Sequence, residues 1–298
     1  MTTINLAGSN MTGPNLTGKV VIVSGAGSGL GRAMSLGLAQ AGATVLGFDV
    51  DAGRANATAG EAKGMKGRVE PATADVRKVE DCARLVETAI SKLGGLTGLV
   101  NCAGIGMPHL SKTYHTEPIH FWKADPQRWQ DVIDVNVRGP FLLARAATPH
   151  MLARKWGRIV NVTTSFNTMI RGANMPYGQS KAALEAATNS WSEDLAGTGV
   201  TANVLVPGGA ADTRLIPDDS PYDRTTLIRP EVMVAPIQWL MSDLSDGVTG
   251  MRLLGQSWNP KAPWQEAMKA AGSKAAWPEL AAEAAKAGQP IPKGGFKK

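Results

Sequence analysis

Residues 19–42 read KVVIVSGAGSGLGRAMSLGLAQAG, and this stretch decides the fold. It opens with a β-branched apolar run that is typical of a buried strand and closes with leucine and alanine at helical density. Gly25, Gly29 and Gly31 lie at the turn between the two. Glycine permits a tight turn there and lets a pyrophosphate approach the backbone N–H groups at the positive end of the helix. The stretch therefore predicts a strand, a phosphate-binding turn and a helix.

The next apolar run, ATVLGFD, ends in an acidic residue, Asp49, 18 residues beyond Gly31. A carboxylate at that place can accept hydrogen bonds from the two hydroxyls of an adenosine ribose. Alternatively, Asp49 only caps or begins the following loop. The order of strand, glycine turn, helix, strand and acid favours dinucleotide binding.

Five short apolar runs along the chain are typical of buried strands: residues 19–25, 43–49, 96–104, 157–163 and 200–208. Alanine- and leucine-rich stretches of helical length separate them. Buried strands joined by helices imply crossover connections, so we expect an α/β fold with a single doubly wound parallel sheet, Rossmann-like, with helices on both faces. The sequence predicts an N-terminal extension (1–17), a dinucleotide-binding catalytic domain (18–255) and a C-terminal arm (256–298).

Composition narrows the class of protein. With 298 residues and 43% hydrophobic side chains, the chain can bury a sizeable core, which excludes a disordered protein. Residues 255–298 carry seven lysines against three glutamates, which is +4 of the net +6, so the body is nearly neutral. These lysines form no run or arginine cluster, and we expect no nucleic-acid partner.

The same sequence predicts a cytoplasmic protein. The N-terminus lacks the basic and apolar regions of a signal peptide, and no stretch approaches 18 uninterrupted apolar residues, so no membrane span is expected. Cys82 and Cys102 are the two cysteines, and they form no ligand cluster or disulfide framework.

A second decisive stretch is MPYGQSKAAL, residues 175–184, in which Tyr177 and Lys181 are four apart and share one helical face. Taken alone, the pair is better explained by a tyrosine that packs and a lysine that is solvated, because short patterns recur by accident. Further motifs follow one order along the chain: Asp75 in TADVRK, Asn101, Ala103 and Gly104 in NCAG, Asn136 in VNVRG, and Pro207 and Gly208 in VPGG. With the glycine turn, these motifs make most of residues 18–255 resemble the short-chain dehydrogenase/reductase family.

The resemblance implies a dinucleotide site in which Asp75 and the NCAG segment line the adenine side and the residues after Pro207 and Gly208 hold the nicotinamide end. The implied cofactor-binding residues are Gly25, Ser28, Gly29, Leu30, Gly31, Asp49, Asp75, Val76, Asn101, Ala103, Gly104, Tyr177, Lys181, Pro207 and Gly208. For Asn101 and Gly104, a turn-building role stays open.

The Tyr177 and Lys181 pair is suited to proton transfer. Carbonyl reduction needs an acid, and alcohol oxidation a base, beside the carbon that exchanges hydride with nicotinamide. A free tyrosine has a pKa of about 10, and a nearby ammonium favours its phenolate. By resemblance, Lys181 also hydrogen-bonds the nicotinamide ribose, and Asn136 holds a water that links Lys181 to solvent. An Asn136 amide satisfied by backbone groups is the alternative.

The chain departs from the family pattern at one catalytic position. The family places a serine thirteen residues before the tyrosine to bind the substrate oxygen, whereas here Thr164 occupies that place and Ser165 follows. Strand register and the count back from Tyr177 favour Thr164. Ser165 stays open, because a shift of one residue at the strand end would turn it inward.

Residues 105–125 form a segment that is long for the family and contains His109, His115 and His120. The histidines have no recognisable ligand spacing, so we expect no metal site. The aromatic residues of this segment indicate either a wall of the substrate site or a subunit contact. The tail carries Trp258, Trp264 and Trp277, and an arm packed on a neighbouring subunit is expected there.

These observations predict an NAD-dependent oxidoreductase that interconverts a secondary alcohol and a ketone. Asp49 would repel the 2′-phosphate of NADP, and neither Ser28 nor Val50 supplies a compensating cation, so NAD is expected to be preferred. The alternatives are a noncatalytic dinucleotide sensor and an epimerase or dehydratase of the same family. The resemblance also implies a homotetramer or homodimer, while the sequence leaves the identity of the substrate open.

Overall fold

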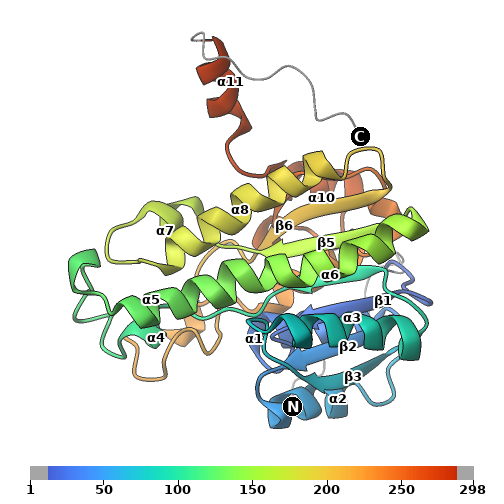
Figure 1. Cartoon of the computed structure of the whole chain (residues 1–298), viewed down its shortest axis with the longest axis horizontal. Coiled ribbons are helices and arrows are strands. Elements are labelled where there is room, and N and C mark those ends of the chain that lie inside the picture. Colours follow the sequence, from blue (N-terminus) through green and yellow to red (C-terminus); the bar gives the residue numbers. More distant parts are fainter. Residues whose placement is uncertain (1–12, 287–298) are drawn as a thin grey trace.

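An eight-stranded sheet forms the centre of the molecule (Figure 1). The computed structural model describes residues 13–286. The strand order is β3-β2-β1-β4-β5-β6-β7-β8, and every neighbouring pair is parallel except the antiparallel β7 and β8. The strands are β1 (Val20–Ser24), β2 (Thr44–Asp49), β3 (Arg68–Thr73), β4 (Gly98–Asn101), β5 (Gly157–Val162), β6 (Val200–Val206), β7 (Met251–Leu254) and β8 (Gly272–Lys274).

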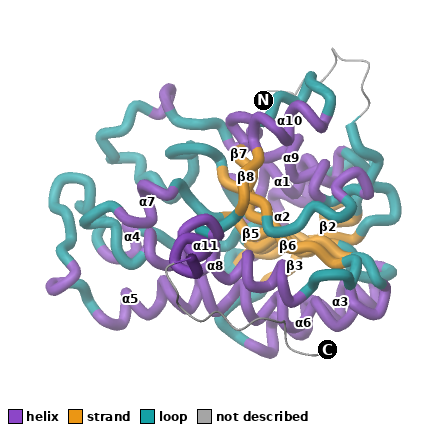
Figure 2. Tube along the Cα trace, turned by 90° about the horizontal axis from the view of Figure 1, so that it is seen from above, coloured by secondary structure: helices purple, strands orange, loops and turns teal. Residues whose placement is uncertain are grey.

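Helices cover both faces of this sheet, as the sequence predicts. Figure 2 shows the strands between two helical layers. The helices are α1 (Gly29–Gln40), α2 (Ala52–Glu61), α3 (Val79–Leu93), α4 (Met107–Leu110), α5 (Pro126–Ile133), α6 (Gly139–Arg154), α7 (Phe166–Ile170), α8 (Tyr177–Asp194), α9 (Val234–Leu240), α10 (Trp264–Ala271) and α11 (Pro278–Lys286). Alternate residues of the strands supply the two cores. Val21 and Val23 pack with α1, α9 and α10, whereas Val20 and Ile22 pack with α3 and α6.

All five predicted strands are present, and each is almost wholly buried. Three strands were not predicted from the sequence. β3 reads RVEPAT and lies on the far side of β2, and only Val69 of its residues is buried. β7 has four residues, and β8 reads GSK, with little intrinsic strand preference. β8 also adds an antiparallel edge to a sheet that was expected to be parallel throughout.

Parts of both predicted appendages lie within the fold. Leu16, from the predicted N-terminal extension, is fully buried, and its N–H donates to the Ala41 carbonyl. From the predicted C-terminal arm, Trp258 and Ala267 are buried in the core, and β8 joins the sheet. Only α11 projects from the described body (Figure 1). Residues 1–12 and 287–298, which complete the two appendages, lie outside the described residues, and the division at residues 17 and 255 stays a prediction.

Candidate active site

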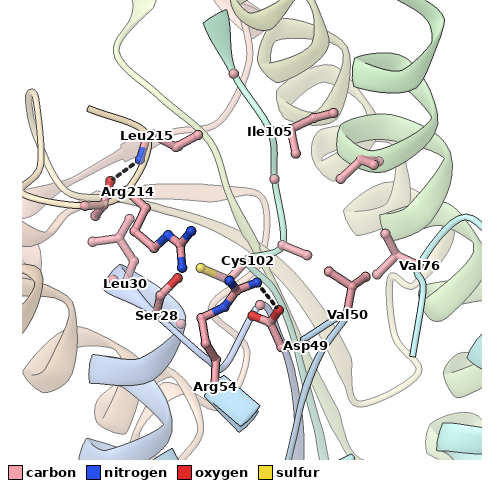
Figure 3. Close-up of a pocket in the computed structure, with 18 of the residues that line it drawn as sticks. Ser28, Leu30, Asp49, Val50, Arg54, Val76, Cys102, Ile105, Arg214 and Leu215 are labelled. Carbon is pink, nitrogen blue, oxygen red and sulfur yellow. Dashed lines mark hydrogen bonds and ion pairs between the residues drawn. The ribbon is translucent and has the colours of Figure 1, made fainter. Parts of the chain in front are cut away.

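A cavity of about 500 Å³ lies beyond the carboxyl ends of β1, β2 and β4 (Figure 3). The sheet reverses its winding between β1 and β4, because the chain places β2 and β3 on one side of β1 and all later strands on the other. Open α/β sheets bind ligands at such a reversal. Ten of the predicted cofactor residues line this cavity: Gly25, Ser28, Gly29, Leu30, Gly31, Asp49, Asp75, Val76, Ala103 and Gly104.

The glycine turn leaves the cavity floor open to a ligand. Gly25 has φ of +68°, and a Cβ there would come within 2.9 Å of the Ala103 Cα. A Cβ on Gly31 would lie 2.1 Å from the Gly25 carbonyl oxygen, so this glycine lets α1 pack directly on the turn. Ser28 precedes α1 without capping it through its side chain. The first N–H groups of α1 consequently face a cavity that can take an anion.

Asp49 lies in the cavity wall, as predicted, but it has a cationic neighbour that the sequence argument overlooked. Its Oδ1 accepts from the Asp51 N–H at 3.0 Å and from Arg54 Nη2 at 3.0 Å. Its Oδ2 accepts from the Gly27 N–H at 3.3 Å. Arg54, on α2, also lines the cavity and pairs with Asp51. The carboxylate is therefore fixed at the end of β2, with part of its charge compensated.

Asn101 lies behind the cavity wall and does not line it. Its Nδ2 donates to Asn161 Oδ1 at 2.8 Å, and Asn161 Nδ2 donates to Thr188 Oγ1 at 2.8 Å. These bonds join β4, β5 and α8. Ser24 fixes the same turn from β1, because its Oγ accepts from the N–H groups of Cys102 and Ala103. Ser24 therefore fixes the turn, Asn101 links β4 to β5 behind it, and the cofactor-binding role of Asn101 stays a prediction.

Asp75 and Val76 line the side of the cavity next to β3. The Asp75 carboxylate accepts from Arg77 at 2.7 to 3.0 Å, and these hydrogen bonds hold its pKa below the usual value. The Asp75 N–H donates to Asp81 Oδ2 on α3. The turn after β3 is thus fixed before any ligand arrives.

Tyr177 and Lys181 stand beside residues 104–106 of the cavity wall. A Cβ on Gly106 would lie 3.5 Å from the Tyr177 ring, and one on Gly104 would lie 3.5 Å from Lys181 Nζ. Both lie on α8, four residues apart as predicted. Lys181 is buried, and its Nζ donates to the Val162 carbonyl at 2.9 Å. Neither residue lines the cavity itself; because Gly104 and Gly106 have no side chains, the amine and the phenol lie close behind its wall.

Burial sets the protonation of both groups. It raises the pKa of Tyr177 to about 12, while a hydrogen bond with the Thr164 side chain acts in the opposite direction. It lowers the pKa of Lys181 to about 8. From the sequence, the Lys181 ammonium is expected to favour the phenolate. Here desolvation is the larger effect on Tyr177, so the phenol keeps its proton at neutral pH.

The structure places Thr164 and Ser165 in different surroundings. The Thr164 side chain lies next to the Tyr177 phenol and acts to lower its pKa, whereas Ser165 Oγ accepts from the Thr168 N–H at 3.2 Å and caps α7. Ser165 Oγ also lies 2.8 Å from Thr168 Oγ1. The Thr164 hydroxyl is accordingly the one beside the phenol, and the Ser165 hydroxyl is committed to the helix end.

Asn136 is fully buried in a π-helical turn, Asp134–Arg138, between α5 and α6. Its Oδ1 accepts from the Ile105 N–H at 3.0 Å, and its Nδ2 donates to the Ile105 carbonyl at 2.9 Å and to Ser180 Oγ at 3.0 Å. The Ile105 backbone and the Ser180 side chain therefore satisfy the amide, and the role of Asn136 in holding a water stays a prediction. These bonds also fix residue 105 of the cavity wall, and π-turns recur at functional positions.

Pro207 and Gly208 follow β6 and do not line the cavity, but the loop that they begin does. Residues 213–215 of that loop reach the cavity, and a Cβ on Gly29 would lie 2.8 Å from Thr213 Cγ2. The Arg54 and Arg214 side chains both point into the cavity (Figure 3). Residues 213–215, Arg54 and Cys102 line the cavity but were not predicted from the sequence. Of these, only Cys102 could have been indicated by the sequence, because it lies within the NCAG motif. No motif marks residues 213–215, which depend on the loop conformation, or Arg54, which reaches the cavity from α2.

The long segment 105–125 begins in the cavity wall. Ile105, Gly106, Pro108 and His109 line it, which supports the substrate-wall interpretation for that part. The histidines are apart from one another: His109 Nε2 lies 2.9 Å from Asp131 Oδ2, His120 stacks on Trp122, and His115 lies edge-on to Tyr222. Among residues 13–286, no group of three or more histidines, cysteines or carboxylates could hold a metal ion.

Among residues 13–286, no helix is long and apolar enough to cross a bilayer.

Comparison with known proteins agrees with this geometry. Residues 19–221 match the family model of the short chain dehydrogenases. A 3-oxoacyl-[acyl-carrier-protein] reductase of Thermotoga maritima is 32% identical over 243 residues, which is 79% of this chain and 95% of the relative. A 2-dehydro-3-deoxy-D-gluconate 5-dehydrogenase of Escherichia coli is 29% identical, over 79% of this chain and 93% of the relative.

Solved structures match as well. One from Beutenbergia cavernae, with NADP bound at low occupancy, has a TM-score of 0.68 and 31% identity, and the match covers 81% of this chain and 96% of that one. A 3-ketoacyl-(acyl-carrier-protein) reductase from Brucella melitensis, complexed with NADH, has a TM-score of 0.69 and 28% identity, over 80% and 96% of the two chains. The chain therefore belongs to the short-chain dehydrogenase/reductase family of oxidoreductases.

Proposed function

We propose that the protein interconverts a secondary alcohol and a ketone with NAD as the preferred dinucleotide. One observation carries the proposal: the phenol of Tyr177, with the Thr164 side chain next to it, stands with Lys181 beside the wall of the cavity at the glycine turn. Acid, oxygen-binding hydroxyl and amine are the groups that carbonyl reduction needs next to one another.

The residues present fit a nicotinamide dinucleotide. The glycine turn and the N-terminus of α1 offer N–H groups to a pyrophosphate, and Asp49 offers its carboxylate to ribose hydroxyls. When bound, a nicotinamide dinucleotide supplies or accepts the hydride. Relatives solved with NADP or NADH support the choice of this cofactor class.

The side chains divide the remaining work. The Thr164 hydroxyl and the Tyr177 phenol hold the substrate oxygen, and in reduction the phenol gives its proton to that oxygen while the carbon receives hydride. In oxidation the same phenol takes the proton back. Lys181 lies within reach of Gly104 and Asn136, where its ammonium stabilises the phenolate left after proton transfer. The raised pKa of Tyr177 suits the reducing direction, since the acid is fully protonated at neutral pH.

The preference for NAD rests on Asp49. A 2′-phosphate would meet this carboxylate, which is only 8% exposed and held by three hydrogen bonds, so it cannot turn away. Arg54 offsets part of the repulsion. We therefore propose a preference for NAD that is smaller than Asp49 alone would give.

The test uses the purified full chain with NADH or NADPH and a panel of ketones that includes ethyl acetoacetate, acetophenone and a 5-keto sugar acid. Loss of NADH absorbance with at least one ketone is the expected result. Binding of NADH without turnover of any member, or of the matching alcohols with NAD, would contradict the proposal and favour a dinucleotide sensor. Cytoplasmic localisation and a homodimeric or homotetrameric state are proposed as well, from the resemblance to the family.

A further inference from the structure

Three consecutive residues at the end of β5 are each held by a different charged side chain. Lys181 Nζ donates to the Val162 carbonyl at 2.9 Å. Glu185 Oε2 accepts from Thr163 Oγ1 at 2.7 Å. Arg252 Nη2 donates to the Thr164 carbonyl at 2.7 Å. The position of the Thr164 hydroxyl therefore depends on side chains from α8 and β7.

Arg252 and Glu185 form one buried unit. Arg252 is 3% exposed and Glu185 is 0% exposed, and Arg252 Nη1 donates to Glu185 Oε2 at 2.6 Å. The same nitrogen lies 3.3 Å from Thr163 Oγ1. The Phe166 ring covers the guanidinium, whose carbon is 4.2 Å from the ring centroid. Glu185 lies one helical turn after Lys181, so the two side chains that hydrogen-bond the end of β5 project from one face of α8.

Such a pair is a poor device for stability alone. Removing two charges from water costs about as much as their attraction returns, and apolar residues of similar volume often serve as well. A guanidinium that bonds a carboxylate, a hydroxyl and a backbone carbonyl at once instead fixes geometry. The peptide that it fixes carries the Thr164 side chain.

The C-terminal segment completes this unit. β8 pairs with β7, opposite Arg252, through Ser273. The Ala276 N–H donates to Glu185 Oε1 at 3.3 Å, which gives the second carboxylate oxygen a partner. Trp277 contacts the Phe166 ring that lies on Arg252, with 6.2 Å between ring centroids.

We infer that Arg252 and Glu185 are positioning residues for the reaction, which hold the Thr164 hydroxyl at the substrate oxygen, and that the segment around β8 locks them in place. This inference rests on the proposed function. It assigns a role to residues that touch neither the cavity nor the phenol.

The experiment compares Arg252→Met with a matched control, Arg158→Met, in the ketone reduction found with the panel. Arg158 is also buried, at 2% exposed, and pairs with Asp246. It lies at the start of β5, at the other end of the strand from Thr164. We expect Arg252→Met to lower kcat about 10- to 100-fold with the KM for NADH unchanged, because displacing one catalytic group has effects of this size. Arg158→Met should lose stability but keep its kcat. Arg252→Lys should recover part of the rate, since an ammonium can reach at least one of the three acceptors that the guanidinium bonds.

Arg252→Met leaves Glu185 buried without its cation, and this variant can fail to fold. The double variant Glu185→Gln, Arg252→Met removes both charges and keeps an acceptor for Thr163, so it provides the same test in a neutral interior. It should show the same fall in kcat.

A cycle with Thr164→Val separates positioning from general loosening. If Arg252 acts through Thr164, the variant that combines Arg252→Met with Thr164→Val should lose little more rate than Thr164→Val alone. Two results would overturn the inference and leave the proposed function intact. One is a rate loss from Arg252→Met that is the same in the Thr164→Val background as in the unmodified protein. The other is a kcat of the Glu185→Gln, Arg252→Met variant equal to that of the unmodified protein. Failure of the unmodified protein to reduce any ketone would overturn the proposed function, and this inference with it.

Discussion

Tyr177 is the residue on which turnover depends most directly. Tyr177→Phe removes the proton donor but leaves the cavity wall, so turnover should be lost and NADH binding should stay close to that of the unmodified protein. Lys181→Ala should weaken both, because the ammonium serves the phenol and lies next to the cavity. Titration of NADH fluorescence beside steady-state rates measures the two effects. Ordinary activity in Tyr177→Phe would contradict the assignment.

The two neighbouring hydroxyls can be separated by substitution. Thr164→Val should lower kcat by an amount equivalent to about 2–4 kcal/mol, as for deletion of an oxyanion donor. Ser165→Ala should keep the rate and instead destabilise the fold by about 1 kcal/mol, because Ser165 caps α7. Rates and urea unfolding of both variants check this prediction. A larger rate loss in Ser165→Ala would reverse the assignment.

Lys181 is expected to make stability depend on pH. Its native pKa of about 8 is below the ordinary lysine pKa of 10.5, so between these values the unfolded chain binds more protons than the native one. Stability should therefore rise with pH across this interval, and the destabilisation is fully present below pH 8. Lys181→Met should be more stable than the unmodified protein at about pH 7, and the difference should shrink by about pH 9. Urea unfolding at both pH values is the measurement, and a difference independent of pH would contradict it.

At this scale the sequence predicted residues with a motif and missed residues that depend on conformation. Tyr177, Lys181, Asp49 and the glycine turn have fixed spacings that follow from helix and strand periods. Arg54 reaches Asp49 only because α2 begins directly after β2, and no spacing rule indicates which way its guanidinium turns.

The unit formed by β2 and α2 sets the choice between NAD and NADP. Asp49→Asn removes the charge that faces a 2′-phosphate, so kcat/KM with NADPH should rise about tenfold relative to NADH. Arg54→Ala should shift the ratio the other way, toward NADH, because the compensating cation is lost. Initial rates with the two cofactors give both ratios. A preference for NADPH in the unmodified protein would show that Arg54 outweighs Asp49.

The elements that the sequence predicted are those whose stability is local or whose burial is complete. The β-branched strands β1, β5 and β6 are buried along their whole length and have clear apolar runs. β8, by contrast, is GSK, and it is a strand only because β7 offers it an unpaired edge. β3 is an edge strand interrupted by Pro71, which a central strand would not tolerate. Whether β3 and β8 form strands depends on the neighbouring strands with which they pair, so their own sequences do not predict them.

The molecule as a whole is expected to associate. Phe141 and Leu152 of α6 are 49% and 40% exposed, which leaves apolar surface on a helix that covers the sheet. We expect sedimentation equilibrium to give two or four times the chain mass of 31.2 kDa. Phe141→Asp should lower that mass, since a carboxylate would be desolvated in a contact. A monomer at micromolar concentration would contradict this expectation.

The contacts of the C-terminal segment also order events during synthesis. Residues of the glycine turn leave the ribosome early, whereas β7, β8 and the Ala276 N–H that reaches Glu185 come from the last part of the described chain. Domains generally fold as units, and Arg252 follows Thr164 by 88 residues in the chain. A nascent chain that stops before residue 252 therefore lacks the side chain that holds the Thr164 carbonyl, so the Thr164 hydroxyl can be aimed only after β7 has been made.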